Sequence, residues 1–197
     1  MGVVLREESP ADLRAYSEIS IMFLVDRVLA PAPDLGPSRF REIACSPPYN
    51  KDYDTERGSH PTEWPQRFDT STWGVISAWK ESDRVGGVVV VHGDDSVHML
   101  EGRQDLAVIW DIRVAPEHRG AGVGSALLGG AESWARSRDC TELKVETQNI
   151  NVAACRFYER TGFHVGRVDP DAYPDLPDET QLLWYKAIPA RDDPATV

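Results

Sequence analysis

The sequence predicts an α/β protein in which a mixed β-sheet of about six to seven strands is flanked by helices. Strand and helix patterns alternate between residues 105 and 188, an order typical of a sheet that contains parallel strands. Two β-rich runs with a turn between them precede that region and predict a hairpin. A glycine-rich turn joins a strand to a helix near residue 120. We expect one domain over residues 1–190 and a flexible tail over residues 191–197.

The composition is that of a soluble globular protein. Hydrophobic residues make up 41% and charged residues 27% of the 197 residues, enough for one sizeable core. No apolar run approaches the roughly 20 residues that a membrane span needs. The N-terminus lacks the basic start and long apolar stretch of a signal peptide. We therefore expect a cytoplasmic protein with no membrane partner.

The net charge is −11, from 32 acidic and 21 basic residues. Such a surface repels nucleic acid, because binding to phosphates requires cationic side chains, so we expect no nucleic-acid partner. It is compatible with a small cationic ligand. The same charge could serve solubility alone.

The cysteines indicate neither a disulfide framework nor a metal site. There are three, an odd number, and they are widely spaced. No cysteine and histidine have the spacing of metal ligands, so we expect no metal. Cys155 lies between Ala154 and Phe157, where a small buried thiol is expected rather than a nucleophile.

The N-terminal region predicts a short strand and then a helix. Residues 3–6 have the apolar character of a first strand, and Ser9-Pro10-Ala11-Asp12 has the features of a helix N-terminus. Leu13, Tyr16, Ser20 and Phe23 then fall near one face of a helix. We expect this helix to end before Pro31, because proline breaks a helix.

Residues 30–72 follow no regular pattern. Prolines recur along this segment and would interrupt a long helix or a central strand, so we expect irregular backbone. Aromatic side chains are interspersed, whereas disordered chains contain few of them. A long irregular segment in a compact domain is usually functional, which favours a lid or part of a binding site. The aromatic residues are Phe40, Tyr49, Tyr53, Trp64 and Phe68.

Two runs with strand character follow, residues 73–79 and residues 84–92, with a turn at residues 81–83. They predict a β-hairpin. Gly86-Gly87 lies inside the second run and indicates a bulge or a close backbone contact.

The C-terminal half predicts alternating strands and helices. We expect strands over residues 105–114, 141–147, 163–168 and 181–188. The first helix has its apolar side at Val123, Leu127, Ala131 and Trp134. The second spans residues 151–160, with Asn151 as its N-cap and Gly162 as its stop.

The turn before the first of these helices has the features of a phosphate-binding loop. The first amides of a helix have no internal partner and point outward with the positive end of the helix dipole. Such a site binds phosphate groups, and an arginine at its entrance adds a permanent positive charge. The candidate residues are Arg119, Gly120, Ala121, Gly122, Val123, Gly124 and Ser125.

Two other phosphate-binding motifs fit this turn less well. A kinase-type P-loop requires Gly-Lys-Ser/Thr, which is absent. A dinucleotide-binding fold has glycine in place of Arg119 and an acidic ribose partner, a role that Glu146 could take. However, only one helix and two strands follow the strand–helix–strand unit, which is too little chain for a doubly wound sheet.

Arg119-x-x-Gly122-x-Gly124 resembles motif A of the GNAT superfamily of N-acetyltransferases, and residues 151–163 resemble its motif B. The resemblance covers roughly residues 73–188 and implies the GNAT fold and acetyl-CoA as acetyl donor. Residues 145–158 and 165–169, with Tyr173, are also similar to streptothricin acetyltransferases. Those enzymes acetylate the β-lysine amine of a cationic antibiotic, which implies a role in antibiotic resistance.

The resemblance implies attack of a neutral amine on a thioester. Glu146 is the first candidate for the base, because a glutamate serves as base at this place in the ribosomal-protein acetyltransferase branch. Asp111 is the second candidate, but it shares a strand face with Arg113 and could simply pair with it. Tyr158 matches the motif-B tyrosine that acts as general acid toward the CoA sulfur. As alternatives, Glu146 could be an ordinary strand-end carboxylate and Tyr158 a packed aromatic residue.

The resemblance also implies how the donor is held. Main-chain groups of Ile112, Arg113 and Val114 are expected to bind the pantetheine arm as though it were another strand. Asn151 is expected to cap its helix and to contact the cofactor arm. Ala154 and Tyr158 are the other expected cofactor contacts from motif B.

For the acceptor, residues 169–179 contain five carboxylates and no cation. This connection commonly borders the acceptor site in the superfamily, and its charge would attract a cation. Aromatic rings could form a wall by cation–π contact, or they could be part of the core. The loop could equally be a solvated connection. The candidate acceptor residues are Tyr49, Tyr53, Trp73, Trp110, Asp169, Asp171 and Tyr173.

Three hypotheses for the function follow. The first is an N-acetyltransferase for a small cationic amine, with a basic antibiotic or polyamine as substrate. The second is acetylation of a protein N-terminus or lysine, which would require an open groove. The third is a CoA-binding sensor without turnover. Because dimers are frequent in the family, a homodimer is also possible.

Overall fold

The computed structural model describes residues 2–32, 34 and 39–189. The expected tail at residues 191–197 lies outside these ranges. Backbone contacts group the chain into two compact units, which are described separately below. Within the described ranges, the first unit comprises residues 2–20, 61–143 and 187–189, and the second comprises residues 21–32, 34, 39–60 and 144–186.

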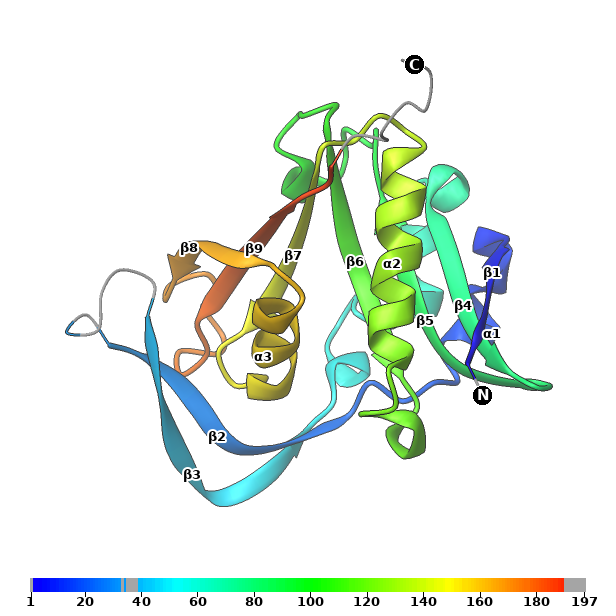
Figure 1. The fold of residues 1–197 in the computed structure, drawn as a ribbon. Helices are drawn as coiled ribbons and strands as arrows, with labels where there is room; N and C mark the ends of the chain where they lie inside the picture. The colour runs from blue at the N-terminus through cyan, green and yellow to red at the C-terminus, as the bar shows by residue number, and fades with distance from the viewer. Residues whose placement is uncertain (1, 33, 35–38, 190–197) are drawn as a thin grey trace, which may run out of the picture. The chain divides into compact units, whose positions relative to one another are not determined.

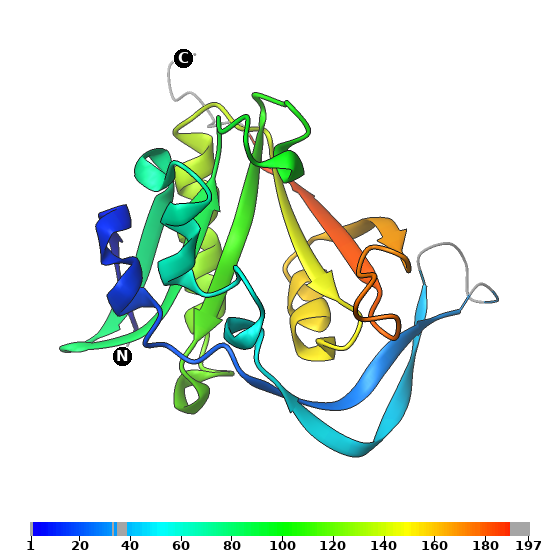
Figure 2. The same ribbon diagram turned by 180° about the vertical axis from the view of Figure 1, so that it is seen from behind.

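The first unit is built on four antiparallel strands. They are β1 (Val4–Glu8), β4 (Gly74–Lys80), β5 (Asp83–Val91) and β6 (Leu106–Val114), each paired with the next in this order. Helix α2 (Val123–Arg136) runs across β4, β5 and β6 on one face, whereas the short helices of residues 10–16 and 61–72 lie on the other (Figures 1 and 2). Successive side chains of a strand point to opposite faces of the sheet. Because both faces are covered, all four residues at positions 88–91 of β5 are fully buried.

The short helices of the first unit have three to six residues each. They are η1 (Pro10–Asp12), α1 (Leu13–Tyr16), η4 (Pro61–Gln66), η5 (Thr70–Thr72), η6 (His98–Leu100) and η7 (Pro116–His118). Ser9 caps η1 through its hydroxyl, as expected for a helix N-terminus. None of the helices in the described ranges has the length and apolar character needed to cross a membrane.

The second unit contains two groups of strands and one helix. Three strands are neighbours in the order β7 (Glu142–Gln148), β9 (Gln181–Ala187) and β8 (His164–Asp169). The first two residues of β7 belong to the first unit. Helix α3 (Val152–Arg160) lies beside these strands (Figure 1). Strands β2 (Phe23–Pro31) and β3 (Phe40–Lys51) form a separate antiparallel ribbon, and η3 (Tyr53–Thr55) follows it.

The main sheet has seven strands in the order β1-β4-β5-β6-β7-β9-β8 and is mixed, which confirms the α/β fold and the expected strand number. The expected hairpin is β4 with β5, and the helix after the glycine-rich turn is α2. Asn151 caps α3 by accepting a hydrogen bond from the Ala154 amide at 3.1 Å, also as expected.

The expected long N-terminal helix was wrong. Helix α1 ends at Tyr16, and the chain enters β2 at Phe23. Ile19, Ile21, Phe23 and Val25 recur at a spacing of two, which is the strand period, and the residues at positions 20, 22 and 24 between them are exposed. The helical interpretation was right for Leu13 and Tyr16, which are both buried in α1, but it also counted Ser20 and Phe23 and so missed the change of period.

The expectation of irregular backbone over residues 30–72 was also wrong for β3. The β2–β3 ladder pairs Ala44 with Arg27 and Tyr49 with Val25, and its register shifts between these two pairs. Pro47 and Pro48 lie within that shift, where a missing amide hydrogen removes no ladder bond. The other regular pieces of the segment are η3, η4 and η5. Its expected role as a lid or acceptor-site segment stays a prediction.

Candidate active site

The turn between η7 and α2 has the backbone that a phosphate-binding loop requires. Gly120 and Gly122 have φ angles of 77° and 85°, in the left-handed region that favours glycine. A Cβ at either position would have no atom within 4 Å, so conformation rather than space requires glycine there. Gly122 is the N-cap of α2 and, because it has no side chain, it leaves the first amides of the helix uncapped. The amides of Val123, Gly124 and Ser125, in the first turn, have no partner within the helix and suit a diphosphate.

The Arg119 guanidinium is held at the start of this loop by two backbone carbonyls. Its Nε donates to the Val114 carbonyl at 2.9 Å, and its Nη2 donates to the Ser20 carbonyl at 3.2 Å. Partial burial lowers the pKa of Arg119, and the charge of Glu117 opposes that change. The guanidinium is therefore tied to the end of β6, next to the amides that would meet the phosphates.

Strand β6 has a register shift at Trp110. Val89 pairs with Asp111 and Val90 pairs with Ile109, so Trp110 is the extra residue of a bulge. Beyond the bulge, Ile112, Arg113 and Val114 pair with residues of β5 along one edge of β6. Their expected role in holding the pantetheine arm stays a prediction, as do the expected cofactor contacts of Asn151 and Ala154.

Asp111, the second candidate for the base, belongs to a buried ion pair. Arg113 Nε and Nη2 donate to its two oxygens at 2.9 and 2.7 Å, and the Tyr16 hydroxyl donates to Oδ1 as well. The side chains of Arg113 and Asp111 are 0% and 8% exposed. Burial, and then the charge of Asp111, raise the pKa of Tyr16 well above its ordinary value. This geometry favours the interpretation that Asp111 pairs with Arg113, because accepting a proton would disrupt a satisfied buried pair.

Gly87 makes room for this network. A Cβ at Gly87 would lie 2.5 Å from the Tyr16 ring, closer than any side chain permits. The close contact that Gly86-Gly87 indicated is therefore the approach of Tyr16, and the β4–β5 register also shifts next to Gly86.

Glu146, the first candidate for the base, lies on β7 among polar partners. Its Oε1 accepts a hydrogen bond from the Tyr173 hydroxyl at 2.6 Å, and its Oε2 accepts one from Gln181 Nε2 at 2.8 Å. Burial, and then the charge of Glu146, raise the pKa of Tyr173, so this tyrosine stays a neutral donor. The structure thus brings together two predicted residues, Glu146 and Tyr173, and adds Gln181, for which the sequence contained no signal.

Tyr158 is packed among aromatic rings of the second unit. Its side chain is 2% exposed, and its ring centre lies 5.2 Å from those of Phe157 and Phe163 and 6.4 Å from that of Trp184. Phe157 is the more exposed ring of the Phe157-Tyr158 pair. The packed interpretation is therefore correct for the ring, and the role of the hydroxyl as general acid stays a prediction.

The acidic residues of the 169–179 connection differ in their surroundings. Asp169 pairs with Arg167 at 2.7 Å and accepts the Asp171 amide at 3.1 Å, and Asp171 itself is exposed. Glu179 is buried and pairs with Lys51 at 2.8 Å. Sequence reasoning counted Glu179 among the carboxylates but did not single it out, because only the fold shows which acid is buried.

The predicted acceptor aromatics fall into two groups. Trp73 and Trp110 lie 5.2 Å apart in the first unit, in a cluster with Trp64 and Phe68. Trp73 is buried there, so the core interpretation is favoured for it. The tyrosines Tyr49 and Tyr53 lie in the second unit, as does Tyr173. The ring centre of Tyr53 lies 5.3 Å from that of Phe23. Burial raises the pKa of Tyr53, and a hydrogen bond with Asn151 partly opposes this rise.

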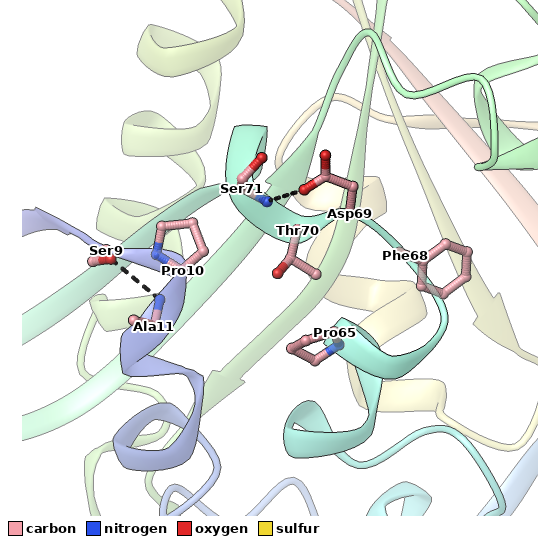
Figure 3. Close-up of a pocket in the computed structure, with 8 residues that line it drawn as sticks. All are labelled: Ser9, Pro10, Ala11, Pro65, Phe68, Asp69, Thr70 and Ser71. Carbon is pink, nitrogen blue, oxygen red and sulfur yellow. Dashed lines mark hydrogen bonds between the residues drawn. The ribbon is translucent and has the colours of Figure 1, made fainter.

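A hollow of about 520 Å³ lies in the first unit (Figure 3). None of the residues predicted to bind donor or acceptor lines it. Two of its polar side chains, Ser9 and Asp69, accept hydrogen bonds from Ala11 and Ser71 and so cap short helices. We assign the hollow no role in catalysis. Its lining residues are Ser9, Pro10, Ala11, Pro65, Phe68, Asp69, Thr70 and Ser71.

The cysteines are free thiols. Burial raises the pKa of Cys155 to about 11, as expected for a packed thiol rather than a nucleophile. Burial also raises the pKa of Cys140 to about 11. Among the described residues, no three or more histidine, cysteine or acidic side chains are grouped so that they could hold a metal ion.

Comparison with known proteins identifies the class. The sequence model of the acetyltransferase (GNAT) family matches residues 39–163, more than half of the chain. The protein therefore belongs to the GNAT family and is an acetyl-CoA-dependent acyltransferase. Within that family it is similar to streptothricin acetyltransferases. The Escherichia coli enzyme is 33% identical over 149 residues, which cover 74% of this chain and 75% of that enzyme. The Streptomyces lavendulae enzyme is 26% identical over 184 residues, 93% of each chain.

Solved structures agree with this assignment. A nourseothricin acetyltransferase is 27% identical and superimposes with a TM-score of 0.74, over 96% of this chain and all of that one. A Bacillus anthracis str. Ames protein solved in complex with acetyl coenzyme A is 28% identical, with a TM-score of 0.76 over 96% of this chain and 100% of that one. The expected family and acetyl donor are thereby confirmed.

Proposed function

We propose that this enzyme transfers an acetyl group to a primary amine of a small cationic acceptor, such as a streptothricin-like antibiotic or a polyamine. The observation that carries the proposal is the orientation of Glu146, whose two oxygens each accept a hydrogen bond, one from Tyr173 and one from Gln181. The net charge of −11 favours a cation, and the relatives named above include two streptothricin acetyltransferases.

Glu146 can remove the proton that blocks the reaction. An alkyl ammonium has a pKa near about 10, so its nitrogen must lose a proton before it can attack a carbonyl carbon. Each oxygen of an ionised carboxylate has two lone pairs. Glu146 therefore retains acceptor capacity toward the ammonium, directly or through one water molecule, while Tyr173 and Gln181 hold its orientation.

Other residues serve the donor. The open amides of Val123, Gly124 and Ser125, with the positive charge of Arg119, suit the diphosphate of acetyl-CoA. As the nitrogen–carbon bond forms, the carbon–sulfur bond breaks and the departing thiolate takes a proton. We assign that proton to the Tyr158 hydroxyl; the nitrogen that has formed the new bond releases its surplus proton to solvent, from which Tyr158 is reprotonated.

An assay of thioester consumption with a panel of amines tests the proposal. We expect turnover with streptothricin and polyamines and a product one acetyl group heavier by mass spectrometry. Turnover only with peptides would instead indicate a protein N-terminal or lysine acetyltransferase. Binding of acetyl-CoA without turnover of any amine would indicate a sensor, and either result would overturn the proposal.

Replacing Glu146 tests its role as base. Glu146→Gln should lower kcat/KM by about 10²-fold and flatten the acidic limb of the pH–rate profile, because a general base contributes roughly 10²- to 10⁴-fold. Glu142→Gln is a matched control, because Glu142 lies on the same strand but pairs with Arg103 at 2.7 Å. It should leave the profile unchanged. An unaltered acidic limb in Glu146→Gln would exclude Glu146 as the base.

A further inference from the structure

Glu179 carries a buried oxygen that has no partner among the described residues. The residue is 7% exposed and lies two residues before β9. Its Oε1 accepts a hydrogen bond from Lys51 Nζ at 2.8 Å, whereas its Oε2 is fully buried and accepts none. An unsatisfied buried carboxylate oxygen is costly, so its persistence points to a donor that the protein does not itself supply.

The charges around Lys51 leave Glu179 able to bind a second cation. Lys51 Nζ also lies 2.6 Å from Glu56 Oε1, so one ammonium faces two carboxylates and the cluster has a net negative charge. Burial lowers the pKa of Lys51, but its contacts with Glu179 and Glu56 raise it by more, so its ammonium stays charged. Lys51 therefore neutralises only part of the charge.

Aromatic rings adjoin the cluster. Tyr53 lies with its ring centre 5.8 Å from Lys51 Nζ. Tyr49 lies two residues before Lys51 on β3 and is 41% exposed. Burial, and then the negative charge of Glu179, raise the pKa of Tyr49, while Lys51 opposes the effect and Asp178 adds to it. Tyrosine rings attract organic cations to their faces, as the Tyr53 ring does with the Lys51 ammonium.

We infer that Glu179 binds, through Oε2, a cationic nitrogen of the acceptor other than the amine that is acetylated. This inference rests on the proposed function. The bound nitrogen is not the nucleophile, because a neighbouring carboxylate raises the pKa of an ammonium and keeps it protonated. Glu146, which belongs to the same unit, serves the reacting amine instead. The preferred acceptor therefore carries at least two cationic nitrogens.

Steady-state kinetics with two acceptors test this assignment. The probes are the N-methylamides of 3,6-diaminohexanoic acid and of 6-aminohexanoic acid, which carry two amines and one. Glu179→Gln keeps the shape of the side chain and removes its charge. It should raise KM for the diamine by about 10- to 100-fold, because an uncompensated buried charge contact is lost. KM for the monoamine and for acetyl-CoA should change by less than about threefold, within the range of neutral substitutions.

Two further variants separate ligand binding from a structural role of the Lys51–Glu179 pair. Glu56→Gln removes the other carboxylate partner of Lys51 and with it the net negative charge of the cluster, so KM for the diamine should rise, but by less than in Glu179→Gln, because only Glu179 contacts the bound nitrogen. Lys51→Met leaves Glu179 without its internal cation and should lower KM for the diamine or leave it unchanged. If Glu179 only held β3 in place, Lys51→Met and Glu179→Gln would raise both KM values together, and thermal unfolding would show the same loss of stability.

The outcomes distinguish this inference from the proposed function. An unchanged diamine KM in Glu179→Gln, or equal effects on both acceptors, would overturn the assignment of Glu179 while leaving an active amine acetyltransferase. Absence of turnover by the unmodified enzyme with every amine would overturn the proposed function, and this inference with it.

Discussion

Glu146 and Tyr158 have different surroundings although both are assigned proton transfers. Glu146 lies among hydrogen-bond donors, whereas Tyr158 lies among aromatic rings with its side chain almost completely buried. Packing against Phe163 and Trp184 holds the Tyr158 ring in one orientation, so removal of the hydroxyl alone should leave the local structure intact.

Tyr158→Phe should therefore separate catalysis from packing. We expect kcat to fall by about 10²-fold, the lower end for loss of a general acid, with acetyl-CoA affinity near normal. The ring contacts persist, so the midpoint of thermal unfolding should stay close to that of the unmodified protein. Stopped-flow detection of CoA release and calorimetric titration of acetyl-CoA measure the two quantities. Full turnover in this variant would remove Tyr158 as the acid.

At the residue scale, the sequence predicted those site residues that belong to local motifs. Asn151 as a cap and the Asp111–Arg113 pair follow from spacing along one helix and one strand. Gln181 and Glu179 could not be predicted, because their roles depend on contacts with Glu146 and Lys51, which are distant in the chain.

At the scale of elements, the loop before α2 depends on backbone conformation. Gly122 has a φ angle of 85° and open space where a Cβ would be, so a side chain there would strain the backbone without a clash. Gly129 lies within the same helix, also with open space around it. These two glycines form a matched pair that differs in backbone conformation.

Gly122→Ala should weaken acetyl-CoA binding, whereas Gly129→Ala should not. A non-glycine residue in the left-handed region costs about 1–2 kcal/mol, which would either destabilise the protein or shift the loop away from its binding conformation. Gly129→Ala should stabilise the protein by about 0.5–1 kcal/mol, because alanine favours a helix interior. Urea unfolding and calorimetry with acetyl-CoA measure both effects. Equal affinity in the two variants would contradict the role of the loop.

Helices and strands were predictable where the spacing of apolar residues stayed constant over a whole segment. The apolar positions of α2 recur at helical spacing, and the strands β4, β5 and β6 lie within about two residues of their expected bounds. The β2–β3 ribbon was missed because Pro47 and Pro48 suggested broken backbone, whereas the register shift accommodates them. Local sequence does not show where a ladder is interrupted, since that depends on the partner strand.

At the scale of the molecule, the fold class was predictable because the order of strands and helices limits the possible topologies. The net charge of −11 was equally visible, but its distribution was not. Several acids are neutralised locally: Asp111 pairs with Arg113, Asp105 with Arg103 and Glu42 with Arg156. Under the proposed function, the attraction of a cationic acceptor would combine a diffuse surface field with the local charge near Glu179.

These two contributions respond differently to salt. The Debye length falls from about 10 Å at 0.1 M to about 3 Å at 1 M ionic strength, so long-range attraction is screened while buried contacts are affected less. KM for a tricationic acceptor should rise by about 3- to 10-fold between low salt and 0.5 M salt, since such fields raise local ligand concentration by at least tenfold. For a monocationic acceptor KM should rise less, and kcat should stay constant. In Glu179→Gln the salt dependence should persist although KM is higher, because the diffuse field is unchanged. Equal salt dependence for acceptors of different charge would show that the acidic surface serves solubility rather than acceptor binding.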